Sequence, residues 1–150
     1  MVDEAVLAWL GRVIDGVLKN LDVLSQVPEA TRLIFEYDAA RVVTAEETRH
    51  VAEEEAARSV LKAFIKKVLA TDNLDYERFR EAAKQVQKET GKKGKDLFHP
   101  IRVAVTGAVS GPELEKLIPI FEEGAKLPLH PPIKSTAQRL AEFAQAANLL

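Results

Sequence analysis

The sequence predicts an all-α fold, and three observations lead to that prediction. Along most of the chain, apolar residues recur at spacings of three and four, which is the period of a helix with one buried face. Residues that cap helices, and glycines that end them, stand between these segments. The one stretch that alternates like a strand, "IRVAV", has no comparable stretch to pair with, so a short helix is predicted there as well.

Two helices are predicted near the N-terminus. An apolar stripe indicates the first, from about Asp3 to about Leu24. The stripe consists of Val6, Leu10, Val13, Ile14, Val17, Leu18 and Leu21. Trp9 lies on or beside this stripe, so we expect it in the core or an interface rather than as an exposed stacking platform. Pro28 stands near the first position of a short second helix, where its missing N–H removes no helical hydrogen bond.

A third helix is predicted in the middle of the chain. Thr44 and Glu47 have the spacing of a capping box, which would open a helix that ends near Leu69. The buried face of this helix is predicted to contain Ala52, Ala56, Val60 and Phe64. The carboxylates at 53–55 point to different sides of a helix, so we interpret them as a solvated face and not as catalytic groups.

The next two helices are predicted from the residues at their ends. Asp75 caps a fourth helix, and Gly91 follows its end, where a left-handed backbone is usual. Pro100 is expected in the first turn of the short helix over "IRVAV". Gly107 is expected to end that helix.

The C-terminal part is predicted to contain two more helices joined by an extended linker. Ser110 and Glu113 have the spacing of a second capping box, and Gly124 is expected to close the helix that follows. The linker is "LPLHPPIK", because paired prolines exclude a helix. The last helix is predicted over about 135–147.

Composition and motifs limit the possible functions. The chain has no cysteine, and its histidines (His50, His99 and His130) are isolated in sequence, so neither a metal site nor a cofactor is predicted. No apolar run approaches the roughly 20 residues that a membrane span needs, and we expect a soluble, cytoplasmic monomer. The sequence contains no phosphate-binding glycine loop, nucleophile elbow or His-Glu-x-x-His pair, so no catalytic residue is predicted.

Charge is distributed unevenly along the chain. The formal net charge is -2, but the segment 62–102 carries +5 and the rest carries -7, so one face can be basic. In this segment, Lys92, Lys93 and Lys95 lie on a glycine-flanked stretch and are suited to neutralising phosphates, although an ordinary solvated turn has the same composition. Arg102 stands at a helix start, where a planar guanidinium can read the edge of a base.

Two stretches, "HPIRVAVTGAVSGPELEKLIPIF" and "LDVLSQVPEATRLIF", resemble the C-terminal anticodon-binding region of bacterial glutamyl-tRNA synthetases. That family has a basic segment, a proline-leucine-arginine motif, a small apolar run, Thr-Gly and a loop with proline. The resemblance covers about Ala5 to about Gly124. It implies an all-α helical cage of two packed lobes, which we place at 1–70 and 71–150. It also implies a tRNA-binding module that is part of an ATP-dependent glutamate–tRNA ligase but is not an enzyme on its own.

The resemblance also implies roles for individual residues. Arg102 matches the motif arginine that contacts the first anticodon base. The loop and helix start around the first two bases are matched by Gly111, Pro112 and Leu114. In an ungapped match, synthetases that distinguish glutamate tRNA from glutamine tRNA carry an arginine where Asn20 stands. Either this chain accepts both tRNAs, or a neighbour such as Lys19 substitutes, or the true alignment is shifted at this position. The proline linker departs from the family pattern, so no role is implied for the last helix.

A second interpretation remains open at this point. A free-standing helical adaptor could keep this fold, lose RNA binding and dock a protein partner through apolar surface. Under the first interpretation, the partners are glutamate tRNA, glutamine tRNA and the catalytic domain of the synthetase. The two interpretations differ in salt dependence, because phosphate contacts weaken steeply with salt whereas apolar contacts do not.

Overall fold

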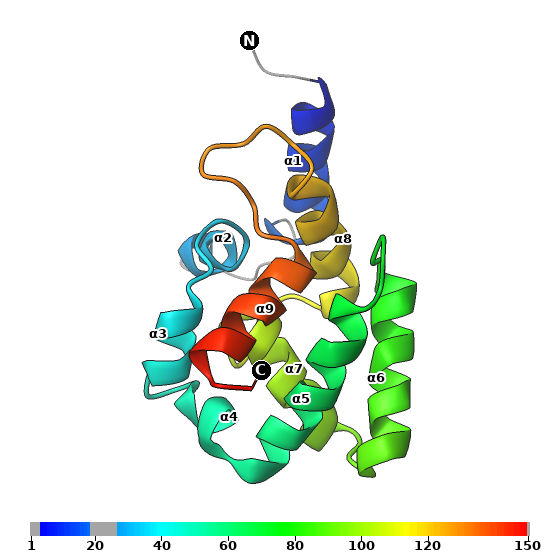
Figure 1. Ribbon diagram of the computed structural model, residues 1–150. Coiled ribbons are helices and arrows are strands. Elements are labelled where there is room, and N and C mark those ends of the chain that lie inside the picture. Colours follow the sequence, from blue (N-terminus) through cyan, green and yellow to red (C-terminus); the bar gives the residue numbers. More distant parts are fainter. Residues whose placement is uncertain (1–3, 19–26, 150) are drawn as a thin grey trace.

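The structure is a computed structural model, and it describes residues 4–18 and 27–149, apart from the side chains of residues 27–30. Over these residues the fold is all-α, as predicted (Figure 1). The helices are α1 (Glu4–Gly16), α2 (Val27–Phe35), α3 (Ala39–Thr44), α4 (Arg49–Glu53), α5 (Glu55–Leu69), α6 (Tyr76–Thr90), α7 (Lys95–Thr106), α8 (Leu114–Gly124) and α9 (Thr136–Ala146). None of these helices is long and apolar enough to cross a membrane.

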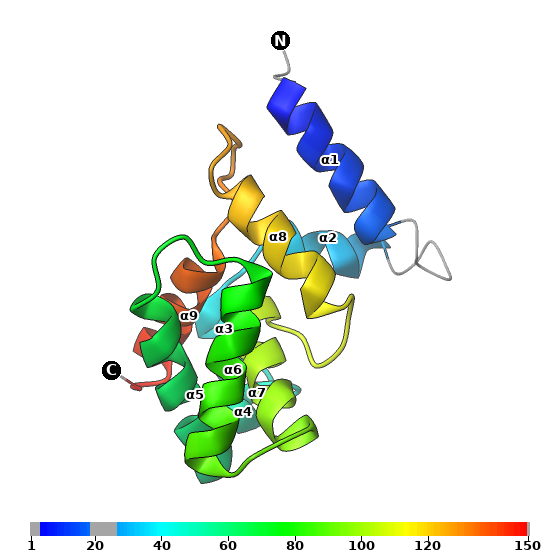
Figure 2. The ribbon, with the colours of Figure 1, turned by 90° about the vertical axis from the view of Figure 1, so that its right-hand side faces the viewer.

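The helices form an upper and a lower group in the view of Figure 1. Helices α1 and α8 pack against each other at the top, and both views place them side by side (Figure 2). Below them, α5 packs on α6, α7 and α9, and α3 packs on α9. The division into lobes at residue 70 stays a prediction, and the buried apolar residues on both sides of it belong to one cluster.

The buried side of α1 is rotated from the predicted stripe. The buried residues of α1 are Val6, Trp9 and Val13, and Val17, which directly follows the helix, is buried as well. Ile14, which was predicted to be buried, is 52% exposed, whereas Trp9 is fully buried, as expected for a core residue. The indole N–H of Trp9 donates to the carbonyl of Ile120 at 2.8 Å and fixes α1 on α8. Helix α1 ends at Gly16, before the predicted end near Leu24.

Gly124 lies where α8 passes closest to the Trp9 indole. A Cβ at position 124 would be 2.8 Å from Cζ2 of Trp9, which is closer than a Cβ approaches an unbonded atom, and 3.1 Å from Cγ2 of Ile133, which is a tight contact. We therefore expect Gly124→Ala to lower the free energy of unfolding by about 1 to 3 kcal/mol, measured by urea denaturation.

A matched control is available on α1. A Cβ at Gly11 would meet nothing within 4 Å, so Gly11→Ala adds the same methyl group to a helix without a clash. Because alanine is the better helix former, this variant is expected to gain about 0.5 to 1 kcal/mol. Equal stability changes in the two variants would contradict the close approach of α8 to Trp9.

The capping box predicted at Thr44 and Glu47 is wrong. Thr44 is the last residue of α3, and its hydroxyl donates at 2.8 Å to the carbonyl of Ala40 in the same helix. Thr48 stands before α4 instead, and its buried hydroxyl donates to the carbonyl of Val42 at 2.6 Å. Both hydroxyls therefore bond to α3, which the spacing of Thr44 and Glu47 alone does not reveal.

The predicted third helix is interrupted at Glu54, where ψ is 132°. The interruption shifts the buried position from the predicted Ala56, which is exposed, to Ala57. The guanidinium of Arg58 donates to the carbonyl of Ala52 at 2.7 Å and so satisfies an acceptor in the last turn before the interruption. The other predicted core residues of this segment are buried, namely Ala52, Val60 and Phe64.

The ends of α6 follow the prediction. The carboxylate of Asp75 accepts a hydrogen bond from the N–H of Arg78 at 2.8 Å, and Gly91 ends the helix with a φ of 74°. The carboxylates at 53–55 are exposed, which agrees with a solvated face. These features depend on short-range spacing, which is why the sequence was sufficient to predict them.

Helix α7 begins earlier than predicted. It covers "IRVAV" as expected and ends at Gly107, whose φ is 78°. However, it starts at Lys95, so Pro100 lies inside the helix rather than in its first turn. Leu97 in this added turn is fully buried. Its burial outweighs the hydrogen bond that Pro100 removes from the helix.

The C-terminal helices agree with the prediction except at the start of α8. Glu113 is the N-cap residue of α8 and makes no side-chain cap, so the capping box predicted for Ser110 and Glu113 is wrong. Gly124 is the last residue of α8, and the linker that follows contains no helix, as predicted. The cap of α9 is a capping box between Ser135 and Gln138, which confirms the predicted helix start.

Candidate nucleic-acid interface

Arg102 reaches from α7 to the loop at 107–113 that connects α7 with α8. Its Nη1 donates to the carbonyl of Pro112 at 2.9 Å. Burial lowers the pKa of Arg102 below its ordinary value, and the carboxylate of Glu113 opposes this shift. A guanidinium has five N–H donors. Among the hydrogen bonds of the described residues, Arg102 uses one of them, so its group is held in place with donors to spare.

The loop at 107–113 packs closely on Arg102 and α2. Gly111 has a φ of 155°, and a Cβ there would be 3.1 Å from Cδ1 of Leu33 and 3.8 Å from Nη1 of Arg102. Both the backbone angle and the space therefore favour glycine. Leu114, the first residue of α8, is half-buried directly after the loop. The structure thus places Gly111 and Pro112 against Arg102, with Leu114 at the start of the next helix, and the roles of these residues in RNA binding stay predictions.

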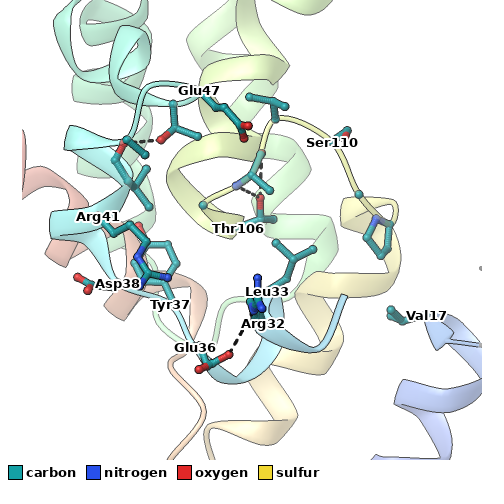
Figure 3. A pocket seen from close by; sticks show the side chains of 18 of the residues that line it. Val17, Arg32, Leu33, Glu36, Tyr37, Asp38, Arg41, Glu47, Thr106 and Ser110 are labelled. Carbon is teal, nitrogen blue, oxygen red and sulfur yellow. Dashed lines mark hydrogen bonds and ion pairs between the residues drawn. The ribbon is translucent and has the colours of Figure 1, made fainter. Parts of the chain in front are cut away.

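A cavity of about 740 Å³ opens beside this loop (Figure 3). Its walls come from the end of α1, from α2 and α3, and from the loop at 107–113. The cations on its wall are Arg32, Arg41 and Lys116, and carboxylates are interspersed with them. Arg32 is 3.9 Å from the carboxylate of Glu36. The lining of the cavity is therefore polar with mixed charge and is not strongly basic.

The wall that α2 and α3 contribute to this cavity was missed by the sequence analysis. Its residues are separated from the loop by about half of the chain, and Arg32 and Arg41 carry no motif. Both arginines are exposed on helices, as most arginines are. No pattern in the sequence would have singled them out.

The predicted phosphate-binding lysines lie at the opposite end of α7 from the loop. Lys93 and Lys95 are exposed, and Lys92 is half-buried. The helical rise separates Lys95 from Arg102 by about 10 Å, and their spacing of seven residues places them on the same face. The lysines are therefore not gathered at Arg102: Lys95 lies on the same face of α7, and Lys92 and Lys93 precede the helix. Asn20 lies outside the described residues, so its role stays a prediction.

His99 occupies that face of α7 between Lys95 and Arg102. Its Nε2 is 2.8 Å from Nε2 of His50 in α4, and the two rings are nearly parallel. The pKa of His99 is lowered by burial, and also by His50, Lys95 and Arg102, while Glu54 opposes this shift. The expectation that the histidines are isolated is therefore wrong for this pair. Within the described residues, no group of three or more ligands could hold a metal ion.

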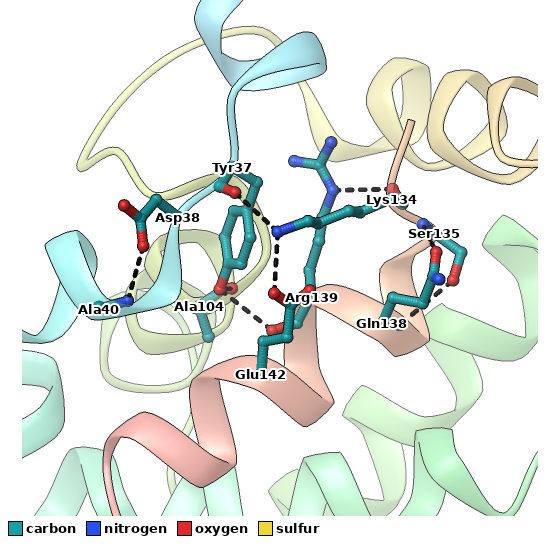
Figure 4. Close-up of polar contacts among 9 residues, drawn as sticks. All are labelled: Tyr37, Asp38, Ala40, Ala104, Lys134, Ser135, Gln138, Arg139 and Glu142. Carbon is teal, nitrogen blue, oxygen red and sulfur yellow. Dashed lines mark hydrogen bonds and ion pairs between the residues drawn. The ribbon is translucent and has the colours of Figure 1, made fainter. Parts of the chain in front are cut away.

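A buried arginine, which the sequence analysis did not single out, fixes the helices behind the loop (Figure 4). Arg139 of α9 is fully buried, and its guanidinium lies 3.7 Å from the centre of the Phe121 ring. Its four hydrogen bonds go to the carbonyls of Leu33, Ile34, Val105 and Lys134. Burial lowers the pKa of Arg139 to about 10, so the group stays charged at neutral pH. Arg139 thus joins α2 to the end of α7, the two elements that hold the loop.

The phenol of Tyr37 lies beside this arginine. Its hydroxyl donates to the carbonyl of Ala104 in α7, and burial raises its pKa above the ordinary value. Lys134 donates to the carbonyl of Tyr37 at 3.1 Å and to the carboxylate of Glu142 at 2.8 Å (Figure 4). Side chains therefore bond to one backbone carbonyl in each of α7, α9 and the segment after α2, namely those of Ala104, Arg139 and Tyr37.

Comparison with known proteins assigns the chain to a family. The chain belongs to the anticodon-binding domain family, whose profile matches residues 2–125. Its curated relatives are glutamate–tRNA ligases, and the resemblance found in the sequence is thereby confirmed. One from Caldicellulosiruptor saccharolyticus is 35% identical over 75% of this chain, one from Listeria innocua is 35% identical over 80%, and one from Bacillus licheniformis is 38% identical over 75%.

The match covers only part of these relatives. The chain spans about a quarter of their length, with shares of 23%, 24% and 23% in the same order. No solved structure matches it significantly. The chain is therefore homologous to the anticodon-binding part of glutamate–tRNA ligases, and α9 lies beyond the end of the family match at residue 125.

Proposed function

We propose that this domain binds the anticodon loop of a tRNA as part of a glutamate–tRNA ligase. The observation that carries the proposal is the junction of Arg102 with the loop at 107–113, beside a cavity of about 740 Å³, in a chain of the anticodon-binding family. Unstacked bases of RNA loops are read by hydrogen bonds to their edges and by apolar contacts to their faces. Both kinds of group are present at this junction.

Each residue of the junction has a proposed task. Arg102 is held by the Pro112 carbonyl and directs its remaining donors at the edge of the first anticodon base. Gly111 allows the backbone to approach the RNA because no side chain stands in the way. Pro112 shapes the loop, and Leu114 supplies an apolar contact.

The lysines at the other end of α7 extend the contact to the RNA backbone. Lys92, Lys93 and Lys95 are proposed to neutralise phosphates, because they are charged, none of them is buried, and Lys95 shares a face of α7 with Arg102. We propose glutamate tRNA as the partner, and also glutamine tRNA because Asn20 stands where an arginine would discriminate. The domain acts as a monomer in the cytoplasm, joined to a catalytic domain, and does not aminoacylate tRNA alone.

The proposal is tested by measuring binding to anticodon stem-loops of glutamate tRNA, glutamine tRNA and an unrelated tRNA at 50 and 200 mM salt. Neutralising about three phosphates of a single strand predicts a loss of roughly 20-fold in affinity over this fourfold rise in salt. We expect the glutamate loop to bind more tightly than the unrelated one at both concentrations. Equal binding of all loops, or none, would overturn the proposal.

Arg102→Ala tests the base contact directly. We expect a loss of about 1 to 3 kcal/mol in binding free energy for the matching loop and a weaker preference at that base, because a bidentate arginine contact discriminates by this amount. Lys93→Ala is the matched control and should weaken all loops alike. An Arg102→Ala protein that keeps its selectivity would show that another group reads the base.

A helical adaptor is the second candidate, and one observation favours it. Helix α1 exposes Leu7 (56%) and Ile14 (52%), which could contribute to an apolar docking surface. Such docking would be insensitive to salt, so the two-salt measurement separates the candidates. Isolated exposed apolar residues are common on proteins, which is why the Arg102 junction carries the proposal instead.

A further inference from the structure

We propose that His99 and His50 form a proton-dependent phosphate contact, so that binding of RNA draws one proton onto the pair. The inference rests on the proposed function, because it concerns the same face of α7. It adds a contact that neither the sequence motif nor the family match assigns.

The position of His99 places it in the path between the two proposed contacts. His99 is four residues after Lys95 and three before Arg102, so the three side chains lie on one side of α7. His99 and His50 are both half-buried, which leaves part of each ring accessible. An RNA backbone that contacts Lys95 while a base reaches Arg102 therefore passes the histidine pair.

The hydrogen bond between the rings determines which ring nitrogen can accept an additional proton. In the neutral pair, one Nε2–H donates to the other Nε2, and only the accepting ring carries a proton on Nδ1. One proton taken from solvent by the Nδ1 of the donating ring leaves the Nε2 contact intact. The pair then has a charge of +1 and an N–H on each Nδ1. Neither Nδ1 has a partner among the hydrogen bonds of the described residues.

Burial and the surrounding charges oppose this proton in the free protein. Burial of the His99 ring is the main cause, followed by His50, Lys95 and Arg102, whereas Glu54, the N-cap residue of α5, favours the proton. Among the described residues, α3 and α9, which also pack on α7, contribute no charge to the causes of this shift. A phosphate placed against Lys95 and Arg102 compensates their charges and so favours the proton.

Linkage gives the sign of the pH effect. The pKa of His99 is lowered in the free protein and rises when phosphate binds, so the complex holds more protons than the separate molecules. Protons must then strengthen RNA binding by the same coupling. Affinity should increase as the pH falls through the range where histidine titrates, roughly from pH 7.5 to 5.5, by at most tenfold per pH unit.

The test uses the whole chain and the anticodon stem-loop of glutamate tRNA, at constant ionic strength between pH 8 and pH 5.5. We expect the affinity of the unchanged protein to rise about threefold to tenfold towards low pH. His99→Gln should have little pH dependence, whereas the matched control His130→Gln, in the exposed linker, should behave like the unchanged protein. A His99→Gln protein with the full pH dependence would overturn the inference.

A second measurement does not depend on any variant. The NMR signal of the His99 ring is followed against pH with and without the stem-loop, and its pKa should rise when RNA is present. An unchanged pKa in an RNA-bound protein would overturn the inference while leaving the proposed function standing. Absence of RNA binding at every pH would overturn both, so the two failures are distinguishable.

Discussion

Arg139→Met is expected to lower the free energy of unfolding by about 3 to 5 kcal/mol. Methionine keeps most of the length of the side chain but none of its donors. The buried carbonyls of Leu33, Ile34 and Val105 then lose the partner that α9 provides. An unsatisfied buried acceptor costs about 1 to 3 kcal/mol, and the lost stacking on Phe121 adds to this. Removing the desolvation of the guanidinium offsets part of the loss, which is why the estimate stays below the sum.

The measurement is urea denaturation with a matched control on the surface. Arg80 in α6 is exposed, so Arg80→Met makes the same chemical change outside the core and should alter stability by no more than about 0.5 kcal/mol. In a thermal melt, the Arg139 variant should unfold at a temperature lower by roughly 10 °C. If the two variants were equally stable, the buried hydrogen bonds of Arg139 would not be what holds α2 to α7.

Trp9→Ala is expected to cost about 3 to 5 kcal/mol, because it empties the largest buried side chain of α1. The same change removes the N–H that bonds to the Ile120 carbonyl and the edge-on contact with Phe35, whose ring centre is 5.8 Å away. Helix α1 then has only Val6 and Val13 buried to hold it in place. Fluorescence cannot follow this variant, so far-UV circular dichroism in urea is the measurement.

Trp9→Phe separates the hydrogen bond from the packing. It keeps a ring but loses the indole N–H. We expect it to lower the free energy of unfolding by less than half as much as Trp9→Ala does. The smaller ring should also make room for a methyl group at position 124, so Gly124→Ala should cost less in the Trp9→Phe background. A full cost in both backgrounds would show that Gly124 is constrained by something other than Trp9.

The helix ends that the sequence predicted correctly are those that depend on nearby residues. Asp75 bonds to an N–H three residues later, and Gly91 and Gly107 end helices by their own backbone angles. The two capping boxes that failed had the same spacing as real ones. Thr44 bonds backwards into its own helix, and the loop before α8 is fixed by Arg102 and α2. Spacing cannot distinguish these outcomes, because the competing partner lies elsewhere in the chain.

The residues of the candidate site also differ in whether the sequence could predict them. Arg102 and the loop at 107–113 were identified because they are close together in sequence and resemble a known motif. The histidine pair joins residues 49 positions apart, and Arg139 bonds to carbonyls more than 100 positions away. Neither the histidine contact nor the hydrogen bonds of Arg139 can be recognised from a single sequence. They become visible only when α4, α7 and α9 are placed against one another.

Because of Arg139, the segment that matches the family is shorter than the segment that packs as one core. The family match ends at residue 125, yet the side chain that ties α2 to α7 comes from the segment after it. A polypeptide truncated at that boundary would keep every residue of the proposed RNA contact and lose the clamp that holds their scaffold. The missing segment, supplied as a separate peptide, could bind where Arg139 contacts the Leu33, Ile34 and Val105 carbonyls and the Phe121 ring. A minimal domain chosen by homology alone would thus be the larger fragment of a protein that needs a second fragment to complete its core.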